Sequence, residues 1–167
     1  MHRKYKLILF TGALLVILSV LLLWPLPVLA VRIYDTNHVL FSAGVSYGDE
    51  FTLQFLHSYE KGWVEETYII EKGHFNLTRH RYQVYSYDAR EFTFPGKFSL
   101  KDGYAIVEDI DSYIKTENRQ LLIRSAYTVP QNILVNNKVF NLNEKTAGGV
   151  LVVIKIESWP FIRKFIQ

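Results

Sequence analysis

The chain of 167 residues contains no cysteine, which excludes disulfide bonds, thiolate metal sites and a lipid attached through an N-terminal cysteine. Acidic residues are absent from the first 31 positions, because all 16 of them lie beyond residue 31. Arg3, Lys4 and Lys6 account for three of the 19 basic residues, so residues 32–167 carry 16 charges of each sign. That part has no net basic charge to suggest a nucleic-acid footprint, and no nucleic-acid partner is expected.

The N-terminal region is an almost unbroken apolar run over residues 7–31 that follows a basic start at residues 2–6. A helix of ~25 residues at ~1.5 Å per residue is long enough to cross a hydrocarbon core of ~30 Å. Positive charge before such a run favours a cytoplasmic N-terminus. The sequence therefore predicts a single-pass transmembrane anchor over residues 1–31 and an extracytoplasmic domain over residues 32–167, located at the cell membrane.

A second interpretation of the same run is a cleaved signal peptide. Pro25 and Pro27 interrupt the helical pattern, and Val28-Leu29-Ala30 has residues suited to a peptidase site, so cleavage after Ala30 would release a secreted domain. The apolar core up to Trp24 is longer than the ~7–15 residues of usual signal peptides. Trp24 also stands where an interfacial aromatic anchor is expected. These features favour retention of the anchor.

Beyond the run, short segments rich in Val, Ile, Phe, Tyr and Thr alternate with Gly, Asn and Asp, a pattern that predicts an all-β, antiparallel β-sandwich or barrel. Asn136-Asn137 is the clearest hairpin turn, since Asn tolerates the positive φ of a two-residue turn. A short helix is expected near residues 108–116. The predicted strands cover residues 31–36, 38–43, 50–58, 63–71, 73–77, 80–87, 104–108, 120–128, 132–135, 138–142 and 149–157.

The segment from Phe51 to Ile70 carries the densest polar chemistry. With a four-residue loop at residues 59–62, Phe55 would pair with Glu66 and His57 with Val64. Because side chains alternate between the two faces of a strand, His57 and Glu66 would then be diagonal neighbours on the apolar face. A carboxylate on that face must be paired or neutralised, and His57 is the expected partner.

Three interpretations of this pair stay open. The first is a structural His–Glu contact that fixes the strand register. The second is a polar pocket at the end of the sheet, lined by His57, Ser58 and Glu66, for a ligand or a partner. The third, a metal site, is disfavoured because His57 and Glu66 supply only two ligands. No metal, no cofactor and no set of catalytic residues is therefore predicted.

Several motifs resemble a family of small exported or anchored proteins of unknown function, whose members are commonly encoded beside TAXI-type TRAP solute transporters. The motifs are residues 48–53, His57-Ser58-x-Glu60-Lys61 and Val64-Glu65-Glu66, and the likeness extends through residues 122–124 and the 134–142 hairpin. The chain departs from the family in the middle, where a Gly-rich stretch is reduced to Phe94-Pro95-Gly96. The resemblance implies a transporter context.

The leading hypothesis is a membrane-anchored extracytoplasmic accessory or binding module that contacts a transporter subunit or its solute receptor. A hydrolase that uses His57 as base and Glu66 to orient it is one alternative. A free binding protein that holds an anionic ligand with Arg124 and Lys61 is another. The candidate ligand- or partner-binding residues are His57, Ser58, Glu60, Lys61, Glu65, Glu66 and Arg124.

Overall fold

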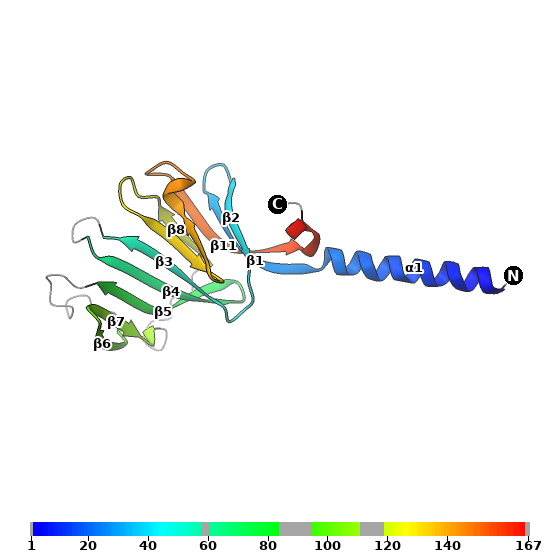
Figure 1. Ribbon diagram of the computed structural model, residues 1–167, viewed down its shortest axis with the longest axis horizontal. Helices are drawn as coiled ribbons and strands as arrows, with labels where there is room; N and C mark the ends of the chain where they lie inside the picture. The colour runs from blue at the N-terminus through cyan, green and yellow to red at the C-terminus, as the bar shows by residue number, and fades with distance from the viewer. Residues whose placement is uncertain (1, 58–60, 84–94, 111–118, 166–167) are drawn as a thin grey trace.

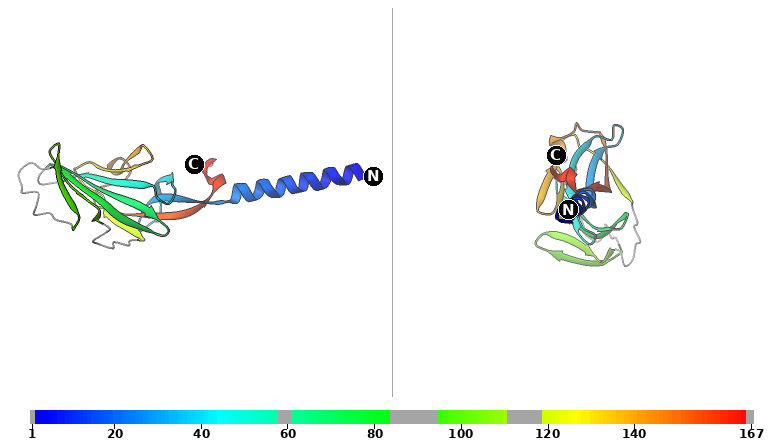
Figure 2. Two further views of the ribbon diagram at one scale, coloured as in Figure 1. Left: turned by 90° about the horizontal axis from the view of Figure 1, so that it is seen from below. Right: turned by 90° about the vertical axis from the view of Figure 1, so that its right-hand side faces the viewer.

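The computed structural model describes residues 2–57, 61–83, 95–110 and 119–165. One helix, α1 (His2–Leu23), precedes a domain built from two antiparallel sheets (Figure 1). The helix ends at Leu23, because Pro25 and Pro27 follow and the residue before a proline disfavours helical backbone angles. Figure 2 shows α1 extending away from both sheets along the long axis of the molecule.

The smaller sheet contains the strand that follows the helix. Its order is β2-β1-β11-β8, so β1 lies between β2 and β11. Strand β1 pairs with β11 over nine residues, from Pro25 opposite Pro160 to Ile33 opposite Val152. The four strands are β1 (Pro25–Ile33), β2 (Val39–Gly44), β8 (Gln120–Arg124) and β11 (Leu151–Pro160).

The larger sheet has the order β10-β9-β3-β4-β5-β7-β6, and each strand in it runs antiparallel to its neighbours. Two short 3₁₀ helices, η3 (Leu142–Glu144) and η4 (Phe161–Phe165), follow β10 and β11. The seven strands are β3 (Glu50–Leu56), β4 (Trp63–Glu71), β5 (His74–Gln83), β6 (Lys97–Lys101), β7 (Tyr104–Glu108), β9 (Gln131–Val135) and β10 (Lys138–Asn141).

The main core lies between the two sheets. Fully buried Val31 and Ile154 from the smaller sheet share one apolar cluster with Phe51 and Phe75 from the larger sheet. The Phe51 ring packs edge-on against Phe75, with centroids 4.9 Å apart, and stacks on Tyr68 at 5.3 Å. The predicted antiparallel β architecture is confirmed, and its two separate sheets form a sandwich-like domain.

The structure divides the apolar run differently from the sequence prediction. The expected boundary at residue 31 falls inside β1, where Leu29, Ala30 and Val31 are fully buried. A peptidase cut after Ala30 would remove six of the nine β1 residues that pair with β11. Across the parts of the chain that the structure describes, no helix has both the length and the apolar character needed to cross a membrane.

Most of the predicted strands are present, but the first one, predicted over residues 31–36, is β1 over Pro25–Ile33, and two others differ. The segments 73–77 and 80–87 belong to one strand as far as Gln83, where the described part of β5 ends. Strand β6 was not predicted. Residues 111–116 of the expected short helix lie outside the described residues. The Asn136-Asn137 turn is confirmed, with φ angles of 48° and 59°.

Candidate functional site

Four of the predicted site residues, His57, Lys61, Glu65 and Glu66, lie in or beside the β3–β4 hairpin of the larger sheet. Phe55 pairs with Val64 and Leu53 with Glu66, so the register differs by two residues from the predicted one. The N–H of His57 donates to the carbonyl of Gly62 at 2.8 Å, which closes the hairpin. A shift of two keeps every side chain on its predicted face, but it places Glu66 four residues, or about 13 Å, from His57 along the strand instead of two.

The partner of Glu66 is His80 on β5, which the sequence analysis did not assign to the site. The two residues are directly opposite each other, with His80 Nδ1 4.0 Å from Glu66 Oε1. The other carboxylate oxygen of Glu66 accepts a hydrogen bond from the Tyr68 hydroxyl at 2.9 Å. The predicted His57–Glu66 contact is therefore replaced by a Glu66–His80 contact supported by Tyr68.

A β-bulge explains why His80 faces this way. Thr67 pairs with Arg79 but Tyr68 pairs with Leu77, so Thr78 is an extra residue on β5. Its hydroxyl donates to the carbonyl of Thr67 at 3.2 Å. One inserted residue reverses the alternation of side chains along a strand. Leu77 and His80 therefore share the core-facing side although their spacing is odd.

A pocket of about 180 Å³ lies beside this contact. His57 and His80 line it together with Tyr82, whose ring centroid is 5.6 Å from that of His80. The full lining is Phe55, His57, Gly62, Val64, His80, Tyr82 and Gln83. The β3–β4 hairpin that contributes to it turns at the end of the domain opposite α1 (Figure 1). The pocket therefore combines two imidazoles with an aromatic and aliphatic wall, and we call it the distal pocket.

Burial sets the protonation states around the distal pocket. It lowers the pKa of His80 from 6.5 to about 4, so the imidazole is neutral at pH 7. Burial, and then the neighbouring Glu66 carboxylate, raises the pKa of Tyr68 well above its usual value. At neutral pH the 4.0 Å approach therefore joins a neutral imidazole to a carboxylate, and Tyr68 stays a hydrogen-bond donor.

The remaining predicted site residues do not join this pocket. Glu65 lies on the opposite face of the larger sheet, where it binds Arg81 Nη1 at 3.0 Å and Gln54 Nε2 at 3.1 Å. Lys61 occupies a left-handed turn position with φ 58°. The Arg124 guanidinium, on β8, donates to the carbonyl of Gly149 at 2.8 Å. Ser58 and Glu60 lie outside the described residues.

The described residues contain no group of three or more His, Asp or Glu side chains placed to hold a metal ion.

Tyr82 and Gln83 complete the distal pocket, although the sequence analysis gave neither a site role. The signal that reveals them is the out-of-phase pattern of Phe75 and Leu77 against His80 and Tyr82. Residues two apart share a face of a strand, as Phe75 and Leu77 do and as His80 and Tyr82 do. The step of three residues from Leu77 to His80 breaks this alternation, and such a break indicates a β-bulge within one strand.

No family model, curated protein or solved structure matches this chain. The resemblance to proteins encoded beside TRAP-type transporters therefore stays a prediction, which rests on the His57 to Glu66 motif.

Proposed function

We propose that this protein is an extracytoplasmic binding module, held at a membrane by α1, that recognises a protein partner through the distal pocket. The observation that carries the proposal is the pairing of two histidines, His57 and His80, in a pocket on the end of the domain away from α1. A module attached at one end presents its opposite end to partners.

The size of the distal pocket favours a protein partner over a free solute. Pockets that hold a whole drug-sized ligand measure roughly 300–1,000 Å³. The distal pocket encloses about 180 Å³, which suits one inserted side chain or a small terminal group. His57 is exposed at the rim of the pocket and His80 is buried inside it. An inserted group would therefore meet one imidazole at the entrance and a second one further in, and both can form hydrogen bonds.

Support for membrane attachment comes from the surface of α1. The large apolar side chains described along residues 8–23 have exposed fractions between 51% and 72%, apart from residue 22. They are distributed around the whole helix, without a polar face. A helix that is apolar on all sides requires an apolar surrounding such as lipid. The basic residues before it favour a cytoplasmic N-terminus and an external domain.

The proposed partner is a membrane subunit or solute receptor of a TRAP-type transporter. This part of the proposal rests on the motif resemblance from His57 to Glu66. The distal pocket contains part of that motif, His57 and Val64, and Glu66 supports it by contacting His80.

Catalysis receives less support than binding. A general base works best with a pKa near the operating pH, and burial lowers the pKa of His80 to about 4. Among the described lining residues, none offers an aliphatic hydroxyl or a thiol as nucleophile. Arg124 and Lys61 do not line the distal pocket, so they do not form an anion-binding site with His57 there.

The test is a pull-down of the tagged full chain from detergent-solubilised native membranes, with captured proteins identified by mass spectrometry. TRAP-type transporter components should be retained by the unaltered chain and depleted by His57→Ala. His38→Ala is the matched control, because His38 is an exposed histidine in the β1–β2 connection and does not line the distal pocket. Thermal melts should show both variants folded.

Equal capture by His57→Ala and the unaltered chain would remove the distal pocket from the recognition surface. Membrane orientation has its own test, in which protease added to intact protoplasts should degrade the β domain. A fully protected domain would place it in the cytoplasm and overturn the external location.

A further inference from the structure

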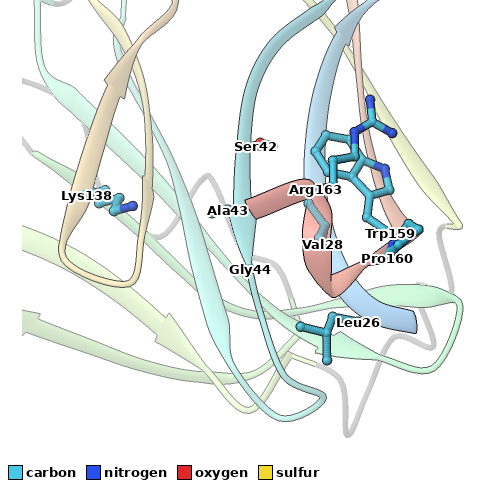
Figure 3. A pocket seen from close by; sticks show the side chains of 9 residues that line it. All are labelled: Leu26, Val28, Ser42, Ala43, Gly44, Lys138, Trp159, Pro160 and Arg163. Carbon is cyan, nitrogen blue, oxygen red and sulfur yellow. The ribbon is translucent and has the colours of Figure 1, made fainter. Parts of the chain in front are cut away.

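A second and larger cavity lies at the other end of the domain, where α1 meets the sheets. It encloses about 390 Å³ between β1, β2, the end of β11 and η4, and we call it the junction pocket (Figure 3). Its nine lining residues are Leu26, Val28, Ser42, Ala43, Gly44, Lys138, Trp159, Pro160 and Arg163. This volume lies within the range of small-molecule sites.

The charge of the junction pocket has one sign. Lys138 and Arg163 are its two ionisable lining residues, and none of the nine described residues that line it is acidic. Glu157, which accepts a hydrogen bond from the lining residue Trp159, is already held by Arg32 and Lys155 at 2.7 and 3.1 Å. The two cations of the pocket therefore favour an anionic ligand.

Arg163 is held in place by an aromatic platform. Its guanidinium carbon lies 3.8 Å from the centroid of a Trp159 ring (Figure 3). The Trp159 indole is itself fixed, because its Nε1 donates to the Glu157 carboxylate at 2.6 Å. A guanidinium stacked on a fixed ring keeps its N–H groups free along its edge, which suits bidentate binding of a phosphate.

The position of the junction pocket indicates which kind of molecule would carry that phosphate. Leu26 lies three residues beyond the end of α1, and the N–H of Phe161 in η4 donates to the carbonyl of Trp24 at 3.0 Å. Apolar Leu26, Val28 and Pro160 share the lining with the two cations. A site that combines cationic and apolar side chains, at the end of a helix that we propose is held in lipid, matches the headgroup region of a lipid.

The geometry points to the junction pocket as a binding site for the phosphate group of an anionic phospholipid. This inference relies on the proposed membrane attachment of α1, and it does not depend on the distal pocket or on any protein partner. Arg163, held on Trp159, would bind the phosphate oxygens, and Lys138 would add positive charge from the opposite side of the pocket (Figure 3). Leu26, Val28 and Pro160 would contact the glycerol and the first acyl carbons.

The test uses the full chain in a neutral detergent, with water-soluble dihexanoyl phosphatidylglycerol, dihexanoyl phosphatidylcholine and inorganic phosphate as separate probes. Isothermal titration calorimetry should show saturable binding of the phosphatidylglycerol. Removing the charge-assisted contact of Arg163 should weaken that binding about tenfold or more in Arg163→Gln, and Lys138→Gln should weaken it by a smaller factor. The indole N–H resonance of Trp159 should shift during the same titration, which localises the ligand.

Lys101→Gln is the matched control, because Lys101 is an exposed cation on β6 that does not line the junction pocket. Its affinity for phosphatidylglycerol should equal that of the unaltered chain. Arg163→Lys keeps the charge and should fall between the unaltered chain and Arg163→Gln, which separates a binding role from a folding role.

Three results would overturn the inference. Absence of saturable phosphatidylglycerol binding would remove the site, and equal affinity for phosphatidylcholine would show that net anionic charge is not recognised. Inorganic phosphate that binds as tightly as phosphatidylglycerol would show a free-anion site. These titrations require neither a bilayer nor a protein partner. A negative titration therefore leaves the pull-down test of the distal pocket unaffected, and a negative pull-down leaves the titrations unaffected.

Discussion

Glu66 and His80 face each other directly across β4 and β5, with the carboxylate Oε1 4.0 Å from the imidazole Nδ1. This contact lies beside the distal pocket and replaces the His57–Glu66 contact that was predicted. Its two members differ in what they do for the fold. Glu66 is the acceptor of the buried Tyr68 hydroxyl, whereas His80 is an imidazole that burial keeps neutral.

Protonation of His80 should destabilise the protein in mild acid. Burial lowers its pKa from 6.5 to about 4, so between these values the unfolded chain binds a proton that the folded chain does not. The contribution of neutral His80 to the free energy of unfolding is therefore fully present above pH 6.5, and it is lost as the pH falls towards 4. The expected loss by pH 5 is about 2 kcal/mol.

Urea unfolding at pH 7.5 and pH 5 measures this loss. The His80→Gln variant should lose less stability than the unaltered chain over the same interval, since glutamine does not titrate. Identical losses in both proteins would assign the acid sensitivity to other groups.

Replacing Glu66 should separate its role as an acceptor from its charge. In Glu66→Ala the buried Tyr68 hydroxyl loses its acceptor, which should cost about 1–3 kcal/mol of unfolding free energy. Glu66→Gln keeps an acceptor oxygen and should cost less than Glu66→Ala. Denaturant melts of both variants provide the comparison, and equal, negligible costs would show that Glu66 is solvated.

The contacts of Glu157 should contribute more stability than those of Glu65. Arg32 holds Glu157 through two bonds of 2.7 Å, and Trp159 donates a third bond of 2.6 Å. Burial alone would raise the pKa of Glu157, but these bonds and Lys155 lower it to about 2. Glu157→Ala leaves largely buried Arg32 without its carboxylate and should cost about 2–4 kcal/mol.

Glu65→Ala is the comparison, because Glu65 forms an ion pair with Arg81 on the outer face of the larger sheet. Its cost should stay within about 1 kcal/mol. Chemical denaturation at neutral pH measures both variants. A smaller cost for Glu157→Ala than for Glu65→Ala would contradict the greater strength assigned to the contacts of Glu157 with Arg32 and Trp159.

Truncation should locate the start of the folded domain. A chain that begins at Pro25 keeps all of β1 and should show cooperative unfolding. A chain that begins at Val31 loses six of the nine residues of β1 that pair with β11, including fully buried Leu29 and Ala30. It should give no dispersed amide spectrum. A well-folded chain beginning at Val31 would show that β1 is dispensable.

The sequence predicted local structure where two signals agreed. Strand β4 has the predicted bounds, residues 63–71, because apolar residues alternate there between clear turn residues. The Asn136-Asn137 turn followed from the tolerance of asparagine for positive φ. Both signals depend on residues that are adjacent in the chain.

Strand β1 was not separated from the helix because both of its faces are apolar. Leu29 and Val31 enter the main core, while Val28 and Ala30 pack with Trp159 on the other face of the sheet. A strand buried on both sides has a continuous apolar sequence, which periodicity alone does not separate from a helix. The two prolines were the local sign of the boundary.

The site was predicted in part for a similar reason. His57 and Glu66 lie on the same side of the β3–β4 hairpin, as the alternation of side chains predicted, but the loop count placed the two strands two residues out of register. His80 depends on a bulge at Thr78, whose position is set by pairing with β4. Register and bulges arise from contacts between strands, so the sequence of one strand does not determine them.

Site-specific photo-crosslinking in intact cells tests the central claim most directly. A photoreactive phenylalanine derivative in place of Phe55, which lines the distal pocket and leaves His57 intact, should give a covalent adduct with a TRAP-type transporter subunit or receptor, identified by mass spectrometry. The same residue at position 38 should not give this adduct, since position 38 does not line the distal pocket. Absence of an adduct at position 55, or the same adduct at both positions, would contradict recognition through the distal pocket.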